Sequence, residues 1–253
     1  MGRFPLTLLY QQKGYFHQKK AMIKAIFFDL WDTVIYLCGS HPVVEIKKRL
    51  SLPEMNIIEF ASILEKTLMV KKFVSVEDEF KELLKNLNIQ ATDTLVHSIS
   101  DIWKKNIHNL YFPPLIEECL KELRKDFKLG LLTNTDSFPY DFVRMRYGIE
   151  NYFDLTIKSF EIGCVKPETT IFKMALDNLG LMPDQVLMCG DNPANDILPA
   201  KSMGMKTLLV DTKRIFTGFG KSDYTVNTIK ELVEKLRSLR QIEFDSKFVN
   251  SKV

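Results

Sequence analysis

The sequence predicts an α/β fold, in which a doubly wound, Rossmann-like parallel sheet is interrupted after its first strand by a helical domain. Residues 23–28 (IKAIFF) form a nearly continuous apolar run, which is typical of a strand buried on both faces. Residues 42–110 contain helix-period stretches and no strong strand pattern. From residue 115 onward, short apolar strands alternate with amphipathic helices, which predicts a parallel sheet with helices on both faces.

The inserted segment is expected to be helical throughout. Its helix-period stretches are VVEIKKRL, NIIEFASILEKTLMVKKF, VEDEFKELLKNL and TLVHSISDIWKKNI. Two consecutive prolines, Pro113 and Pro114, end the helical pattern. We therefore expect a helical cap domain at residues 37–112, and a core domain built from residues 22–36 and 113–240.

The core segments after the insert are assigned in chain order. We expect strands in KLGLLT, at residues 154–158, in VLMCGD and in KTLLVD, with helices between them and a last helix in TIKELVEKLRSL. Residues 241–253 have no clear period and are expected to form a tail. Residues 1–21 are expected to be a disordered leader, and Met22, directly before the first strand, is the hypothetical native start.

Composition excludes several classes of function. The formal charge of +3 is small for 253 residues, and no dense Lys/Arg run is present, so nucleic-acid binding is not expected. No window approaches 18 consecutive apolar residues, so no membrane span is expected. The four cysteines form no CxxC pair and are expected to be buried thiols in a reducing compartment, which favours a cytoplasmic location. The sequence does not predict the oligomeric state.

Polar residues follow the predicted strands. Because the carboxyl ends of parallel strands lie along one edge of a sheet, we expect these side chains to converge. Clustered carboxylates suit Mg²⁺, and a lysine and a hydroxyl offset the charge of phosphoryl oxygens. One carboxylate can attack phosphorus and form an aspartyl-phosphate. The residues concerned are Asp29, Thr133, Asn134, Lys166, Asp191 and Asp196.

At these positions the chain resembles the haloacid dehalogenase (HAD) superfamily of hydrolases over residues 22–240. Four motifs occur in the expected order, and the order is more specific than any single motif. They are Asp29 to Thr33, LLTN with Thr133, Lys166-Pro167, and GDNPAND with Asp191 to Asp196.

The resemblance implies a metal site and a nucleophile. Asp29 would be the nucleophile and a Mg²⁺ ligand, and the backbone carbonyl of Trp31 would be a second ligand. Asp191 would bind the metal directly or through water, supported by Asp196.

The resemblance also implies how a small phosphorylated substrate is held. Thr133 and Lys166 would bind the phosphoryl group, and Asn134, which follows Thr133, is expected in the same site. The helical block would be a C1-type cap that closes over the site and excludes water.

The chain departs from the family pattern at Trp31, where phosphatases usually have the aspartate that acts as general acid and base. General acid–base catalysis contributes about 10²- to 10⁴-fold. One interpretation is therefore a phosphatase that is weak or acts on good leaving groups. Asp32 would replace the missing acid only if the loop is helical, since on a strand it would face away from Asp29.

Two alternatives remain open. A 2-haloacid dehalogenase also has an aromatic residue at this position. The dehalogenase pattern, however, has serine where this chain has Asp191 and tyrosine where it has Phe172. It also has an arginine in the cap, whereas the basic residues between 61 and 80 of this chain are all lysines. A non-catalytic protein that binds phosphate or a partner would gain nothing from clustered carboxylates, which are costly without compensation. We therefore expect a Mg²⁺-dependent hydrolase of a small phosphorylated substrate, acting through Asp29.

Overall fold

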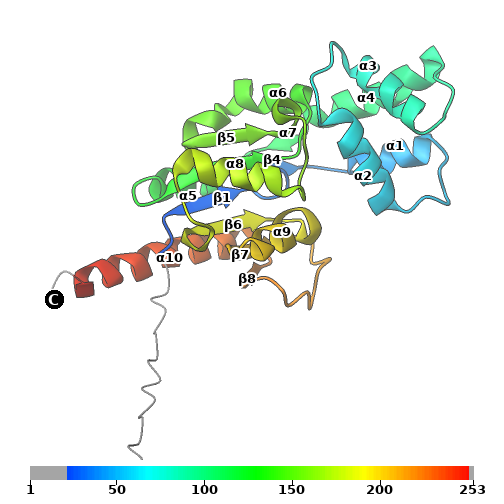
Figure 1. Ribbon diagram of the computed structural model, residues 1–253. Coiled ribbons are helices and arrows are strands. Elements are labelled where there is room, and N and C mark those ends of the chain that lie inside the picture. The colour runs from blue at the N-terminus through cyan, green and yellow to red at the C-terminus, as the bar shows by residue number, and fades with distance from the viewer. Residues whose placement is uncertain (1–21, 251–253) are drawn as a thin grey trace, which may run out of the picture.

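The computed structural model describes residues 22–250, with side chains to residue 240, so the leader expected at residues 1–21 lies outside the described residues. A six-stranded sheet of order β5-β4-β1-β6-β7-β8 forms the centre of the molecule, and every pairing in it is parallel (Figure 1). The predicted doubly wound α/β fold is confirmed. The strands are β1 (Ala25–Phe28), β4 (Lys128–Thr133), β5 (Leu155–Lys158), β6 (Val186–Gly190), β7 (Lys206–Val210) and β8 (Tyr224–Val226).

Strand β1 lies between β4 and β6 and is buried on both faces. Ile26 and Phe28 pack into one apolar cluster, and Ala25 and Phe27 pack into another on the opposite face. The alternation of side chains along a strand sends successive residues to opposite faces, so a strand covered on both sides needs an unbroken apolar run. The central position of β1 places its carboxyl end between those of β4 and β6.

Helices cover both faces of the sheet. Helices α5 (Pro114–Leu123), α6 (Ser137–Tyr147) and α10 (Ile229–Asn250) contribute to the cluster around Phe28. Helices α8 (Thr169–Leu179) and α9 (Leu198–Ser202) contribute to the cluster around Phe27. The result is the three-layered arrangement expected when strands and helices alternate along the chain.

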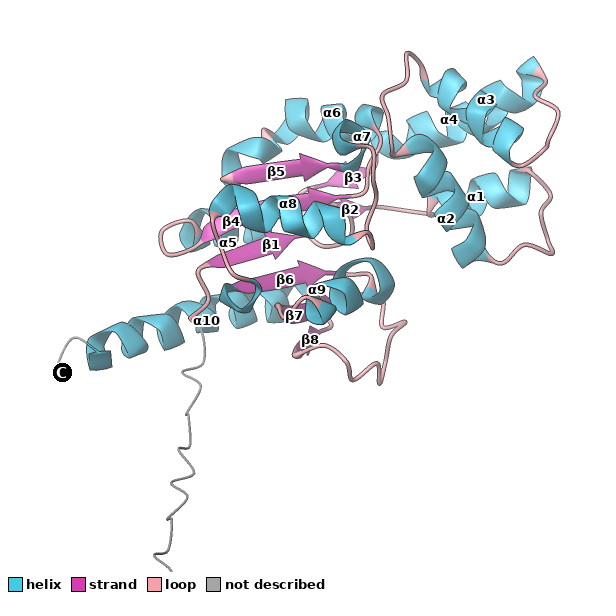
Figure 2. Cartoon of the chain, viewed as in Figure 1, coloured by secondary structure: helices cyan, strands magenta, loops and turns pink. Residues whose placement is uncertain are grey.

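The inserted segment is helical, as the sequence predicts. Asn56, Ser75 and Thr92 each precede a helix, and each side chain accepts a hydrogen bond from a backbone N–H in the first turn. Figure 2 shows the strand arrows pointing toward these helices, so the insert lies at the carboxyl-terminal edge of the sheet. The four helices are α1 (Pro42–Arg49), α2 (Ile57–Leu68), α3 (Val76–Asn86) and α4 (Asp93–Ile107).

The insert has its own apolar core and also packs against the sheet domain. Phe60, Phe80 and Trp103 belong to this core, and Val165 and Phe138 of the sheet domain join it. Two short strands, β2 (Tyr36–Leu37) and β3 (Leu110–Tyr111), pair antiparallel where the chain enters and leaves the insert.

Some local features differ from the sequence expectations. Helix α10 continues past residue 240 to Asn250, into the stretch expected to be a tail, and the sequence there contains no glycine or proline to end it. Cys38 is exposed, whereas the other three cysteines are buried as expected, and all four are free. Among the described residues, no helix combines the length and apolar character that crossing a membrane requires.

Candidate active site

Three carboxylates meet at the carboxyl end of the central strands. Asp29 directly follows β1, and Asp191 and Asp196 follow β6. One oxygen from each lies within 4.8 Å of the others. Asp196 is 1% exposed, and its approach to the sheet requires glycine at position 190, where a Cβ would lie 2.3 Å from the Asp196 Cγ. The sheet edge thus brings these three predicted residues together.

Lys166 enters the same cluster from the loop before α8. Its Nζ lies 2.5 Å from Oδ1 of Asp29 and 2.6 Å from Oδ1 of Asp196, and the side chain is 2% exposed. Burial alone would lower the pKa of Lys166, but Asp196 and Asp29 together raise it, so the side chain is a cation. Lys166 is therefore the positive charge that holds two of the three carboxylates in place.

One lysine does not compensate three carboxyl groups, of which Asp29 and Asp196 are buried and Asp191 is half-buried. Burial, opposed by Lys166, raises the pKa of Asp29 to about 7, and burial together with Asp29 and Asp196 raises the pKa of Asp191 well above its ordinary value. Both shifts are those of a site that lacks positive charge. A divalent cation with a preference for hard oxygen ligands, such as Mg²⁺, fits this donor set.

The loop after β4 positions the lysine. The Asn134 carboxamide accepts a hydrogen bond from the Lys166 backbone N–H at 2.7 Å and donates one to the Lys166 carbonyl at 2.9 Å. Its remaining donor goes to Oε2 of Glu65 at 3.0 Å. Thr133, expected to contact the phosphoryl group, is fully buried directly before Asn134. The Asn134 side chain thus connects the loop after β4 to Lys166 and to Glu65 of the insert.

Trp31 and Asp32 occupy the turn after β1. The indole Nε1 of Trp31 donates to the backbone carbonyl of Asn134 at 3.1 Å. Asp32 lies neither on a strand nor in a helix: its φ of 53° is left-handed, and its carboxylate pairs with Lys213 Nζ at 2.5 Å. Asp32 was expected to replace the missing acid only if the loop after β1 were helical, and this turn is not helical.

Glu65, on helix α2 of the insert, is a site residue that sequence reasoning missed. Its Oε2 accepts hydrogen bonds from Asn134 at 3.0 Å and from Asn195 at 3.4 Å. Burial raises the pKa of Glu65, while Asn134 and Lys166 oppose the shift. A glutamate in an amphipathic helix ordinarily faces solvent, so no signal in the sequence distinguishes it.

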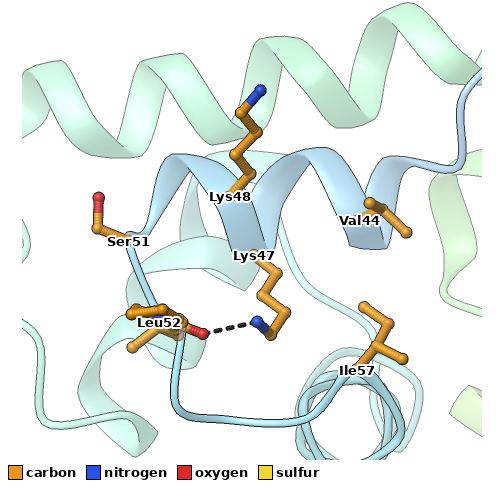
Figure 3. A pocket seen from close by; sticks show the side chains of 7 residues that line it. Val44, Lys47, Lys48, Ser51, Leu52 and Ile57 are labelled. Atoms are coloured by element: carbon orange, nitrogen blue, oxygen red, sulfur yellow. Dashed lines mark hydrogen bonds between the residues drawn. The ribbon is translucent and has the colours of Figure 1, made fainter.

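A surface hollow on the insert is separate from this cluster. It lies between α1 and the start of α2, where Lys47 Nζ donates to the Leu52 carbonyl at 2.6 Å (Figure 3). Its lining contains none of the clustered carboxylates and no other acidic side chain, so it is not the candidate active site. The lining residues are Val44, Lys47, Lys48, Ser51, Leu52, Pro53 and Ile57.

Comparisons with known proteins show which family the sequence resembles. A family model described as haloacid dehalogenase-like hydrolase matches residues 23–204. A glyceraldehyde 3-phosphate phosphatase from Methanocaldococcus jannaschii is 30% identical over 237 residues, covering 87% of this chain and 100% of that protein.

Two solved structures share the fold. A 2-haloacid dehalogenase from Pseudomonas syringae has a TM-score of 0.56 at 20% identity, covering 86% of this chain and 99% of its own. A HAD family enzyme from Bacteroides thetaiotaomicron, solved with magnesium and inorganic phosphate, has a TM-score of 0.54 at 21% identity, covering 74% of this chain and 94% of its own. From the family match and the M. jannaschii relative, we conclude that the chain belongs to the haloacid dehalogenase-like hydrolase family.

Proposed function

We propose that the protein is a Mg²⁺-dependent phosphatase that hydrolyses a small phosphate ester through an aspartyl-phosphate on Asp29. The observation that supports this most is the cluster of Asp29, Asp191 and Asp196 around one buried lysine at the end of the central strand. These three carboxylates exceed the charge that the lysine supplies, which favours a bound cation over a metal-free site.

The proposed metal ligands are Asp29, Asp191 and the backbone carbonyl of Trp31, with Asp196 in support. When bound, Mg²⁺ would offset the negative charge of the carboxylates and of the phosphoryl oxygens. Asp196 is already held at both oxygens, since Oδ1 pairs with Lys166 and Oδ2 accepts from the Asn192 backbone N–H at 3.0 Å. It is therefore suited to orienting the site.

The reaction follows from the groups around Asp29. A carboxylate oxygen of Asp29 attacks phosphorus, the bond from phosphorus to the ester oxygen breaks, and the departing oxygen takes a proton from solvent water to leave as the alcohol. Water then attacks the aspartyl-phosphate, which releases inorganic phosphate and restores the carboxylate. Lys166 and Thr133 would bind the phosphoryl oxygens, and Asn134 would hold Lys166 in position through the two hydrogen bonds between them.

Trp31 limits the range of substrates. Position 31 carries no titrating group to protonate the departing alcohol, so esters with good leaving groups are expected to react fastest. The M. jannaschii relative, by its name, acts on glyceraldehyde 3-phosphate, which makes this three-carbon ester the first natural substrate to test.

The dehalogenase alternative is less well supported by the site. The fold alone does not decide, because a dehalogenase shares it. Asp191 stands where the dehalogenase pattern has serine, and Phe172, fully buried on α8, offers no hydroxyl where that pattern has tyrosine. The carboxylates near Asp29 instead favour a metal-assisted reaction.

Product release with and without chelator tests the proposal. Phosphate should be released from acetyl phosphate and glyceraldehyde 3-phosphate with Mg²⁺ and not with EDTA. Chloride release from 2-chloropropionate that persists in EDTA, without phosphate release from either ester, would refute the phosphatase and support the dehalogenase. Release of neither product would support a non-catalytic binding protein.

A further inference from the structure

Glu65 lies across the end of the strand that bears Asp29. Asn134 follows β4 and Asn195 follows β6, and β1 lies between these two strands. One oxygen of Glu65 accepts from both carboxamides, at 3.0 and 3.4 Å. The carboxylate therefore bridges the two neighbours of β1 and places a negative charge from the insert over the site of Asp29.

The charge of Glu65 is not neutralised by an ion pair. Among the described residues no lysine, arginine or histidine forms an ion pair with Glu65, and Lys166, which acts on its carboxylate, has its Nζ paired with Asp29 and Asp196. The other carboxylate oxygen, Oε1, takes no hydrogen bond from any side chain or backbone group that the structure describes. Glu65 thus offers a free, negatively charged acceptor.

This acceptor faces the departing part of the substrate. In phosphoryl transfer the attacking and leaving oxygens are roughly in line, so the leaving group points away from Asp29. Asp29 lies at the sheet edge and Glu65 comes from the insert beyond that edge, so the leaving group extends toward Glu65. A hydroxyl there can donate to Oε1, whereas a second anion would meet a like charge in a partly buried site.

We propose that Glu65 is a specificity-determining residue that accepts uncharged, hydroxylated leaving groups and rejects those carrying a carboxylate or a second phosphate. The inference rests on the proposed phosphatase function and narrows its substrate class. A like charge in the binding site is a common way for a protein to reject the wrong substrate. It changes the relative rates of different substrates more than it changes the chemical step.

A matched pair of three-carbon esters tests this role. Glyceraldehyde 3-phosphate and 3-phosphoglycerate differ in an aldehyde against a carboxylate at the carbon farthest from phosphorus. The ratio of their kcat/KM values should favour the aldehyde in the wild type at pH 8. Glu65→Gln and Glu65→Ala should each shift this ratio toward 3-phosphoglycerate by roughly tenfold or more, mainly because the carboxylate substrate then binds more tightly.

The control variant is Glu59→Gln, which removes an exposed carboxylate from the same helix and should leave the ratio unchanged. Acetyl phosphate turnover confirms that each variant retains a working site. An unchanged ratio in both Glu65 variants, or equal loss on both three-carbon esters, would overturn the inference while leaving the phosphatase intact. Absence of Mg²⁺-dependent turnover of acetyl phosphate by the wild type would instead refute the proposed function, and the inference with it.

Discussion

The contact between the insert and the sheet domain contains a carboxyl group whose replacement should stabilise the protein. Glu79, on α3, is 0% exposed, and neither of its oxygens has a hydrogen-bond partner among the described residues. Asp136, at the start of α6, lies close enough to repel it, and one oxygen of Asp136 is also buried without a partner. Burial, with the repulsion from Asp136, raises the pKa of Glu79 to about 10.

The sign of the pH effect follows from this shift. Between its ordinary pKa of 4.5 and about 10, folded Glu79 holds a proton that the unfolded chain releases, so the free energy of unfolding falls as pH rises. The slope is about 1.4 kcal/mol per pH unit for one such group. From pH 5.5 to 8.0, the free energy of unfolding of the wild type should therefore fall by about 3 kcal/mol because of Glu79. The Glu79→Gln variant should not show this loss, because glutamine is neutral at every pH.

Thermal unfolding in EDTA at several pH values measures this difference. A change of 1 kcal/mol shifts the unfolding midpoint by about 2–4 °C in proteins of this size. The midpoint of Glu79→Gln minus that of the wild type should therefore be larger at pH 8.0 than at pH 5.5 by about 6–12 °C. Folded Glu79 stays protonated below about pH 10, so Asp136 has a neutral neighbour in both proteins and its own titration cancels from the difference. The control is Glu54→Gln, which changes an exposed carboxylate of the insert. Parallel loss of stability in the wild type and Glu79→Gln would refute a buried, neutral Glu79.

Two substitutions in the turn after β1 test where the leaving group obtains its proton. Trp31→Asp should raise turnover of glyceraldehyde 3-phosphate relative to acetyl phosphate by about 10²-fold, the lower end of the contribution of general acid catalysis, and an unchanged ratio of initial rates would contradict this. Asp32→Asn should change kcat on either ester by less than about threefold, because the Asp32 carboxylate is already paired with Lys213; a loss of about 10²-fold or more would show that Asp32 is the acid.

Much of the sheet and most of the candidate site could be predicted from sequence patterns. The apolar run through β1, the end of β4 at Thr133 and Asp191 directly after β6 are local signals, and the parallel sheet brings them to one edge without further information. The short strand β8 was missed because the three residues Tyr224–Val226 carry too little alternation to be recognised. The ending of α10 was misplaced because the helix persists where the apolar period fades.

The missed site and interface residues share a different cause. Glu65 and Glu79 are charged residues in amphipathic helices, and helical periodicity assigns such residues to solvent. Their environments depend on how the insert packs against the loops after β4 and β6, which is a contact between segments far apart in the chain. The role of Asp32 could not be predicted for a related reason, since the direction of its side chain depends on a left-handed backbone conformation at that residue. The environments of these residues are therefore determined by long-range packing, which local sequence patterns do not predict.

Trapping the phosphorylated enzyme is a direct test for an aspartyl-phosphate on Asp29. The protein is mixed with labelled acetyl phosphate and Mg²⁺, quenched in acid during turnover, digested, and the peptides are examined by mass spectrometry. We expect a hydroxylamine-sensitive phosphoryl group on the peptide that contains Asp29, absent in EDTA and absent in Asp29→Asn. Turnover without any labelled peptide, or a label that persists in Asp29→Asn, would contradict an aspartyl-phosphate on Asp29.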